Sequence, residues 1–209
     1  MIVNIGLIAL TLSFVCAAYA TVAAIYGERR RQPAWVASAR NALVIIWPLV
    51  TLVGLAIINT LMTGDYNVVY AYNTSSLAMP AYLRITSWWG GQAGSLTFWS
   101  WLMAAFAISV MLRKWERDED LLPYVIAVIS VTLAFFLGLS LFLENPFARW
   151  WQVGGADPST GSGQAPVAAV FPPVGGVPFF PDDGRGLNPL LRHPGMIIHP
   201  PLLYIGFVG

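Results

Sequence analysis

Charge and cysteine are both scarce in this chain of 209 residues. Only 10% of the residues are charged, whereas soluble globular domains carry about 25%, so a soluble domain is excluded. The single cysteine, Cys16, rules out an internal disulfide, a cysteine-based zinc cluster and the Cys-x-x-Cys-His site of covalent haem. Any haem on this chain must be held without thioether bonds. A net charge of +1 with no basic stripe excludes nucleic acid from the expected partners.

Hydrophobic residues make up 57% of the chain and occur in long runs. A membrane-spanning helix needs about 20 mostly apolar residues, and four segments approach this length without any Asp, Glu, Lys or Arg. They cover residues 2–26, 42–62, 95–112 and 123–143. The first is too long for a secretory signal and lacks the basic residues that precede one. The sequence therefore predicts an all-α integral membrane protein with four complete transmembrane helices, the start of a fifth, and two external loops.

Basic residues mark two of the connections between these helices, at 29–40 and 113–120. Both connections lie on one side of the membrane if each helix pair crosses it, and short basic connections favour the cytoplasm. We therefore expect a multi-pass protein of the cell membrane with these two connections in the cytoplasm and the N-terminus outside. Basic groups also suit helix C-termini through the helix dipole, a local role that is compatible with this topology.

The two external loops then cover residues 63–94 and 144–198. Aromatic and β-branched residues predict an extended stretch at 65–73 in the first loop, and residues 80–87 are expected to form a short interfacial helix. The second loop is rich in proline and glycine. Its composition at 150–181 is typical of a loop with no core of its own.

Trp88 and Trp89 stand at the mouth of the third predicted helix, followed by Gly90, Gly91 and Gly94. Glycines allow close backbone approach, so a flat ligand could lie against either indole. The alternative is an aromatic belt at the level of the lipid headgroups. Residue chemistry alone leaves both interpretations open.

The chain has two histidines, His193 and His199, and neutral imidazole is a good ligand for iron. His193 precedes a proline in a turn, which favours a structural role. Pro200 and Pro201 stiffen the backbone beside His199, where the final apolar run of residues 199–209 begins. The alternative for His199 is a capping or interfacial role.

Four motifs occur in an order that resembles a known family. They are WGGQAGS at 89–95, NPFAR at 145–149, GLNPLL at 186–191 and HPPLLYIGFVG at 199–209. Together they resemble the CcmF-type haem-handling membrane proteins of cytochrome c maturation, over essentially the whole chain. Two features differ from the family pattern: Gln92-Ala93 stands where many relatives have His-Glu, and the stretch at 150–181 is longer.

The resemblance implies a cytochrome c-type biogenesis protein that binds or handles haem on the periplasmic side and takes part in its covalent attachment to apocytochrome c. It implies that His199 is an axial ligand of the haem iron, with Trp88 and Trp89 near the haem or a partner. Expected partners are a haem chaperone, apocytochrome c, and either other maturation membrane subunits or the remainder of the same protein, besides the lipid bilayer. Whether haem is transported, chaperoned or ligated here stays open.

The same resemblance implies that any enzymatic role is that of a haem lyase (cytochrome c synthase) subunit. The family's tryptophan-rich haem domain and second external histidine lie beyond residue 209, so we do not expect this stretch to be active alone. Two other classes remain: a non-catalytic scaffold that recruits a periplasmic partner, and a transporter subunit. A transporter normally carries ionisable residues within its spans, and the predicted spans contain none. A scaffold would need no iron ligand at His199.

Overall fold

The computed structural model describes residues 1–113, 115, 119–153 and 165–208. Within these residues, four helices are long and apolar enough to cross a membrane. They are α1 (Ile2–Arg29), α2 (Pro33–Thr63), α5 (Gln92–Leu112) and α6 (Leu122–Phe142). This arrangement confirms the predicted all-α membrane fold.

A further apolar helix, α7 (Pro194–Val208), follows the long segment after α6. It begins at Pro194 and not at His199, where the final apolar run of the sequence starts. Proline suits the first turn of a helix because its missing N–H would have no partner there. The His193 Nδ1 atom accepts a hydrogen bond from the Gly195 N–H (3.1 Å), which caps this first turn. His199 therefore lies inside a helix whose start is locally fixed.

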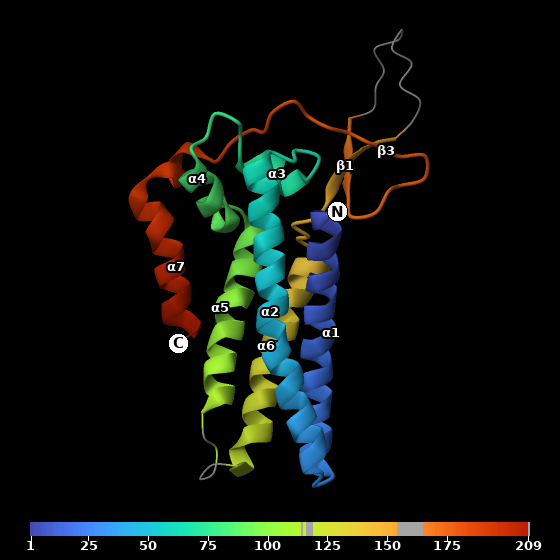
Figure 1. The fold of residues 1–209 in the computed structure, drawn as a ribbon, viewed down its shortest axis with the longest axis vertical. Coiled ribbons are helices and arrows are strands. Elements are labelled where there is room, and N and C mark those ends of the chain that lie inside the picture. Colours follow the sequence, from blue (N-terminus) through green and yellow to red (C-terminus); the bar gives the residue numbers. More distant parts are fainter. Residues whose placement is uncertain (114, 116–118, 154–164, 209) are drawn as a thin grey trace.

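The long helices form a bundle in which α1 and α5 each pack against α2 and α6 (Figure 1). One end, here called the N-terminal end, holds the N-terminus, the short elements between α2 and α5, and the segment leading into α7 (Figure 1). The other end, here called the turn end, holds the α1–α2 turn and the α5–α6 connection. Helix α7 contacts α5 on the outside of the bundle and runs from the N-terminal end toward its middle.

Small side chains allow α1 to approach its neighbours closely. The buried face of α1 contains Ala9, Ala17, Ala20, Ala23 and Ala24. In a membrane, lipid tails are as apolar as a helix surface, so helix association depends on close packing of this kind. The buried side chains of α2 are larger, among them Leu43 and Ile46, so the α1–α2 contact combines small with large residues.

Two glycines of the bundle face aromatic rings directly. A Cβ at Gly54 in α2 would overlap the Trp88 indole, and a Cβ at Gly6 in α1 would overlap the Phe147 ring. Both rings come from the segments at the N-terminal end, so these glycines let those segments pack into the bundle. The short elements are thereby fixed to the membrane helices.

Side-chain hydrogen bonds also join neighbouring helices. Trp101 Nε1 on α5 donates to Thr51 Oγ1 on α2 (3.0 Å), and Thr21 Oγ1 on α1 bonds to Ser130 Oγ on α6 (2.9 Å). Such interhelical bonds contribute about 0.6 kcal/mol each in membrane proteins. They specify the register of the helices more than they add stability.

The stretch at 65–73 corrects one sequence prediction. It was expected to be extended, but helix α3 (Val69–Thr74) occupies its second half. The helix turns Tyr70 into the core, where the hydroxyl lies within hydrogen-bond distance of the Ser87 and Trp88 carbonyl oxygens (2.7 and 2.9 Å). This tertiary contact outweighs the local β propensity of the sequence.

The next short elements lead directly into α5. Helix α4 (Ala81–Thr86) lies within the stretch expected to be helical, and the 3₁₀ turn η1 (Ser87–Trp89) follows it. The turn orients the two tryptophans differently: Trp88 faces the bundle core, whereas Trp89 is half-buried beside α7.

A small antiparallel sheet stands in the segment after α6, which composition alone assigned to loop. Its central strand β1 (Arg149–Gln152) pairs with β2 (Val167–Ala169) and β3 (Val177–Pro178). Trp151 is buried, and its Nε1 donates to the Ala169 carbonyl oxygen (3.0 Å). Residues 154–164 of the stretch predicted as a loop at 150–181 lie outside the described residues.

Gly94 offers a test of this packing. A Cβ at Gly94 would overlap the Trp88 carbonyl oxygen and the Tyr70 hydroxyl, and overpacking of this kind typically costs about 1–3 kcal/mol. We expect Gly94→Ala to lower the unfolding temperature of the protein in detergent. Gly206→Ala is the control, because among the described residues nothing beyond its own helix backbone and chain neighbours lies within 4 Å of a Cβ at that position. Equal unfolding temperatures for the two variants would contradict this account of the η1–α5 junction.

Candidate functional site

The imidazole of His199 is exposed on α7. No described residue forms a hydrogen bond with its side chain, which leaves a ring nitrogen available to a ligand. The exposed side chains of Ile198, Leu202 and Leu203 lie close to it in the sequence of the same helix. An available imidazole beside exposed apolar side chains fits the needs of a haem, which combines an iron that takes nitrogen ligands with an apolar macrocycle. The site residues present are therefore compatible with haem.

The two prolines after His199 leave a backbone carbonyl without its usual partner. In an α-helix the N–H of Pro201 would bond to the Ile197 carbonyl oxygen, but proline has no N–H. The indole Nε1 of Trp89 takes that place and donates to the Ile197 oxygen (3.0 Å). A buried or half-buried carbonyl needs such a partner. The Trp89–Ile197 bond thus fixes α7 to the start of α5, two residues away from His199.

A second contact holds α7 one turn after His199. Tyr204 stacks on Trp99 of α5, with ring centroids 5.4 Å apart and planes at 10°. Phe98 also contacts the Tyr204 ring at a centroid distance of 6.1 Å. Aromatic pairs of this kind contribute about 0.5–1.5 kcal/mol beyond their buried area. Helix α7 is thus attached to α5 on both sides of His199.

The chain that enters α7 is fixed by backbone pairing with the α3 region. The Arg185 N–H donates to the Tyr72 carbonyl oxygen (2.7 Å), and the Gly186 N–H donates to the Ser75 carbonyl oxygen (3.1 Å). Gly186 has a φ of 79°, a left-handed conformation that glycine adopts without strain. This pairing accounts for the glycine of the GLNPLL motif.

The Asp183 carboxylate also helps to hold the segment that precedes α7. Its Oδ1 accepts hydrogen bonds from the Leu77 N–H (2.8 Å) and the Gly184 N–H (2.7 Å). These bonds, the one from Leu77 first, hold the pKa of Asp183 below its ordinary value, because they favour the ionised form. The charged state of Asp183 therefore stabilises the segment before α7.

A small apolar cluster completes the support. Leu187 is buried with Met79 and Leu83, and Leu191 and Ile197 pack against this cluster. The 3₁₀ helix η3 (Pro189–Arg192) continues from it, and Asn188 Oδ1 caps η3 by accepting from the Leu190 N–H (3.0 Å). The GLNPLL motif therefore supplies an apolar anchor and a turn before the histidine helix.

The structure separates the two candidate tryptophans. Trp88 is only 8% exposed, its ring contacts Phe98 edge-on, and its Nε1 donates to Thr97 Oγ1 (3.1 Å). The Trp88 indole fills the space above Gly54 and faces the core of the bundle. Trp89, by contrast, is joined to α7 near His199.

Tyr70 is a supporting residue that the sequence reasoning missed. Besides its contacts to the Ser87 and Trp88 carbonyls, its hydroxyl accepts from the Gly91 N–H (3.2 Å). Burial raises its pKa, so the phenol stays protonated and keeps its donor. Gly91 and Gly94 allow this close approach, and the glycine spacing was the only signal of it in the sequence.

Comparison with known proteins gives consistent results. A family model described as "Cytochrome C assembly protein" matches residues 89–209. The cytochrome c-type biogenesis protein CcmF of Escherichia coli (strain K12) is 30% identical over 209 residues, which cover 100% of this chain and 28% of that protein. The cytochrome c-type biogenesis protein CycK of Rhizobium meliloti (strain 1021) is 32% identical over 212 residues, covering 100% of this chain and 27% of that protein.

One solved structure has a similar fold. A cytochrome c haem lyase CcmF superposes with a TM-score of 0.65 and 17% sequence identity, covering 70% of this chain and 25% of that chain. At this identity the similarity supports the fold alone. The present chain spans little more than a quarter of the length of the curated relatives it matches.

The Trp89–Ile197 bond can be tested with Trp89→Phe, which keeps the aromatic ring and removes the indole donor. A hydrogen bond of this type contributes about 1 kcal/mol, so amides of α7 should exchange with deuterium roughly 2- to 10-fold faster. Hydrogen exchange followed by mass spectrometry on peptides covering residues 194–208 measures this change. Trp35→Phe at the turn end, where Trp35 is exposed, is the matched control. Unchanged exchange in α7 would show that the bond does not hold the helix.

Asp183 gives a prediction for pH. Since its folded pKa is depressed, its contribution to stability is present above its ordinary pKa of 3.8 and is lost as the pH falls through the lower folded value. We expect Asp183→Asn to lower the unfolding temperature at neutral pH and to match the wild type in strong acid. Asp182→Asn is the control, because that carboxylate has no hydrogen bond to a described residue. A difference between wild type and Asp183→Asn that persists below the folded pKa would contradict the charge argument.

Proposed function

The chain belongs to the cytochrome c assembly protein family, and from this premise we propose that it handles haem within a cytochrome c maturation system of the membrane. The single observation that carries the proposal is the available imidazole of His199 on a helix that is fixed on both sides of it. An axial ligand must present a neutral nitrogen in a defined direction. The HPP motif and Trp89 fix the helix that presents the imidazole of His199.

In this proposal His199 donates one axial ligand to the iron of an incoming haem, which is the cargo of the system. The second ligand comes from a later segment of the same protein or from a partner chain. Trp89 positions the helix that carries His199. Trp88 belongs to the core that supports Trp89. The haem vinyl groups and the cysteine thiols of apocytochrome c supply the thioether chemistry themselves, and this chain contributes binding and orientation.

We place the N-terminal end of the bundle on the periplasmic side of the inner membrane. The support is the distribution of basic residues: Arg29, Arg30, Arg31, Arg40 and Arg113 all belong to the turn end. Short basic connections stay preferentially in the cytoplasm. His199 then lies where a haem chaperone and apocytochrome c would meet it, with other maturation subunits or the remainder of the protein beside α7.

A non-catalytic scaffold is the second candidate, and one surface favours it. Phe171, Val174 and Phe180, around the β2–β3 turn, expose 72%, 99% and 67% of their surface. Exposed apolar side chains at one end of a membrane protein suit the docking of a partner. In that role the protein would recruit a periplasmic partner and would be indifferent to His199.

Substitution of His199 decides between these roles. Changing even an indirect partner of a metal ligand costs about 10- to 100-fold in affinity, so His199→Ala in the full assembly should lower haem occupancy and holocytochrome yield at least that much. The absorption spectrum of the reduced, detergent-purified protein measures occupancy. Added imidazole should partly restore the ligated-haem spectrum of His199→Gly.

His193→Ala is the matched control, because His193 caps the start of α7 and is not proposed to bind iron. It should retain the haem spectrum. A His199→Ala protein with wild-type haem spectrum and wild-type yield would remove His199 from the mechanism and favour the scaffold.

A further inference from the structure

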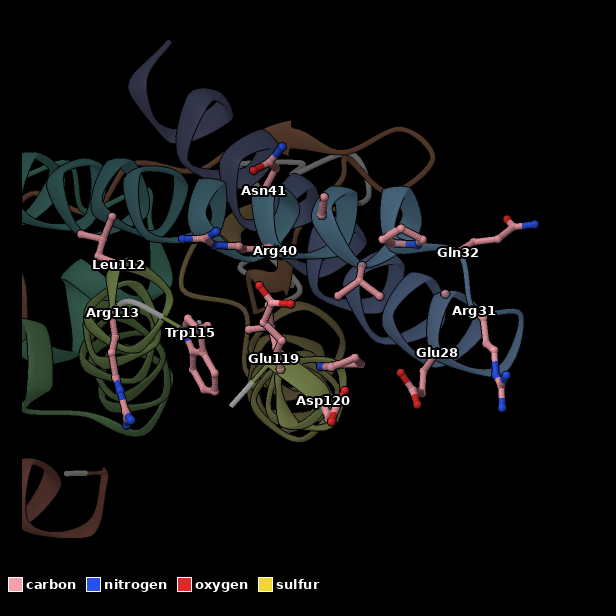
Figure 2. Close-up of a pocket in the computed structure, with 16 residues that line it drawn as sticks. Glu28, Arg31, Gln32, Arg40, Asn41, Leu112, Arg113, Trp115, Glu119 and Asp120 are labelled. Carbon is pink, nitrogen blue, oxygen red and sulfur yellow. The ribbon is translucent and has the colours of Figure 1, made fainter. Parts of the chain in front are cut away.

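A cavity of about 850 Å³ lies at the turn end of the bundle (Figure 2). Helix α7, which carries His199, begins at the other end of the bundle (Figure 1). It is bounded by the α1–α2 turn, the end of α5 and the start of α6, which the 3₁₀ helix η2 (Glu119–Leu121) precedes. The apolar spans of α5 and α6 end and begin here, at Leu112 and Leu122. The cavity is therefore at the depth of the lipid headgroups and not in the hydrocarbon core.

Among the residues that the structure describes, charged groups of both signs line this cavity. The basic side chains are those of Arg31, Arg40 and Arg113, and the acidic ones are those of Glu28, Glu119 and Asp120 (Figure 2). Neither Arg31 nor Arg40 forms an ion pair with a carboxylate among the residues that the structure describes. Opposite charges thus stand around one cavity while these two arginines remain unneutralised by their neighbours.

Arg40 is held in place and keeps donors to spare. One of its guanidinium nitrogens donates to the Met111 carbonyl oxygen at the end of α5. A guanidinium carries five N–H donors in a planar fork, a geometry that matches phosphate. The remaining donors are available to an occupant of the cavity.

The carboxylates of η2 provide hydrogen-bond acceptors on the side of the cavity formed by the start of α6. Glu119 and Asp120 are exposed, and neither forms a hydrogen bond with a described residue. In Figure 2 the Glu119 side chain extends toward the helix that carries Arg40. Trp115 stands beside them with its Nε1 bonded to the Val110 carbonyl oxygen (3.0 Å), a placement typical of a tryptophan at the membrane interface.

We propose that this cavity binds the headgroup of phosphatidylethanolamine. The phosphate lies against Arg40, and the primary ammonium group donates to Glu119, whose side chain extends toward the helix that carries Arg40 (Figure 2). A purely anionic headgroup would meet the Glu28, Glu119 and Asp120 carboxylates of the lining unfavourably. A zwitterionic headgroup offers a phosphate to the arginine side chain and an ammonium donor to the carboxylate. The volume lies in the range of about 300–1,000 Å³ that is usual for small-molecule sites, and the exposed side chain of Leu112 lines the cavity where the acyl chains would leave it.

Native mass spectrometry of the purified full chain tests this proposal, after equilibration with equal amounts of phosphatidylethanolamine, phosphatidylcholine and phosphatidylglycerol. The quaternary ammonium of phosphatidylcholine cannot donate a hydrogen bond. A charge-assisted hydrogen bond differs from none by about tenfold or more in affinity, so phosphatidylethanolamine should be retained about tenfold more than phosphatidylcholine.

Two variants test the contact with the ammonium group and the contact with the phosphate separately. Glu119→Gln combined with Asp120→Asn should abolish the preference for phosphatidylethanolamine over phosphatidylcholine while retaining phospholipid. Arg40→Gln should weaken retention of both lipids. Because loss of the Met111 contact could also disturb folding, the acidic double variant carries the decision. Glu144→Gln is the matched control, since Glu144 follows α6 at the opposite end of the bundle, and it should leave the preference unchanged.

Three results would overturn the proposal: stronger retention of phosphatidylglycerol, equal retention of phosphatidylethanolamine and phosphatidylcholine by the wild type, or a preference that survives in the acidic double variant. Glycerophosphoethanolamine, the headgroup without acyl chains, distinguishes a lipid from a free phosphate ester. If it competes as well as the intact lipid does, the occupant is a soluble ester and the lipid assignment is wrong.

Discussion

The hydrogen bond from Trp89 Nε1 to the Ile197 carbonyl oxygen is the contact on which the rest of the candidate site depends. It exists because Pro201 cannot supply the helical N–H that this carbonyl would otherwise accept. The missing donor inside α7 is thus replaced by one from η1, the turn that precedes α5. Two motifs more than 100 residues apart, WGGQAGS and HPPLLYIGFVG, become one structural unit through this bond.

Other interactions at the N-terminal end support this bond in turn. Tyr70 holds the η1 turn that presents Trp89, and the glycines at 91 and 94 leave room for its hydroxyl. The backbone pairing of Arg185 and Gly186 with the α3 region brings the chain to the start of α7. The long membrane helices, joined by small residues and a few hydrogen bonds, form the rigid base for these elements. Packing away from His199 therefore fixes the helix that carries it.

The sequence predicted the membrane architecture because an uncharged apolar run of about 20 residues has the length and composition of a membrane-spanning helix. It did not predict α3, because the aromatic and β-branched residues at 65–73 favour a strand locally, and only the buried Tyr70 contact reverses that preference. It singled out His199 and the neighbouring tryptophans but could not separate Trp88 from Trp89. That separation depends on a 3₁₀ turn that rotates one indole into the core and the other toward α7.

The central claim is that His199 is the protein ligand of haem iron, and one spectroscopic measurement addresses it directly. These 209 residues contain two histidines, so an iron–histidine mode that is present in a His193→Ala protein and lost when His199 is also changed to Ala comes from His199. Resonance Raman spectra of the ferrous haem complex, with and without ¹⁵N-labelled histidine, report the iron–histidine bond itself. An isotope shift of the iron–histidine mode is the predicted result. Bound haem without any mode that responds to the label would contradict the account.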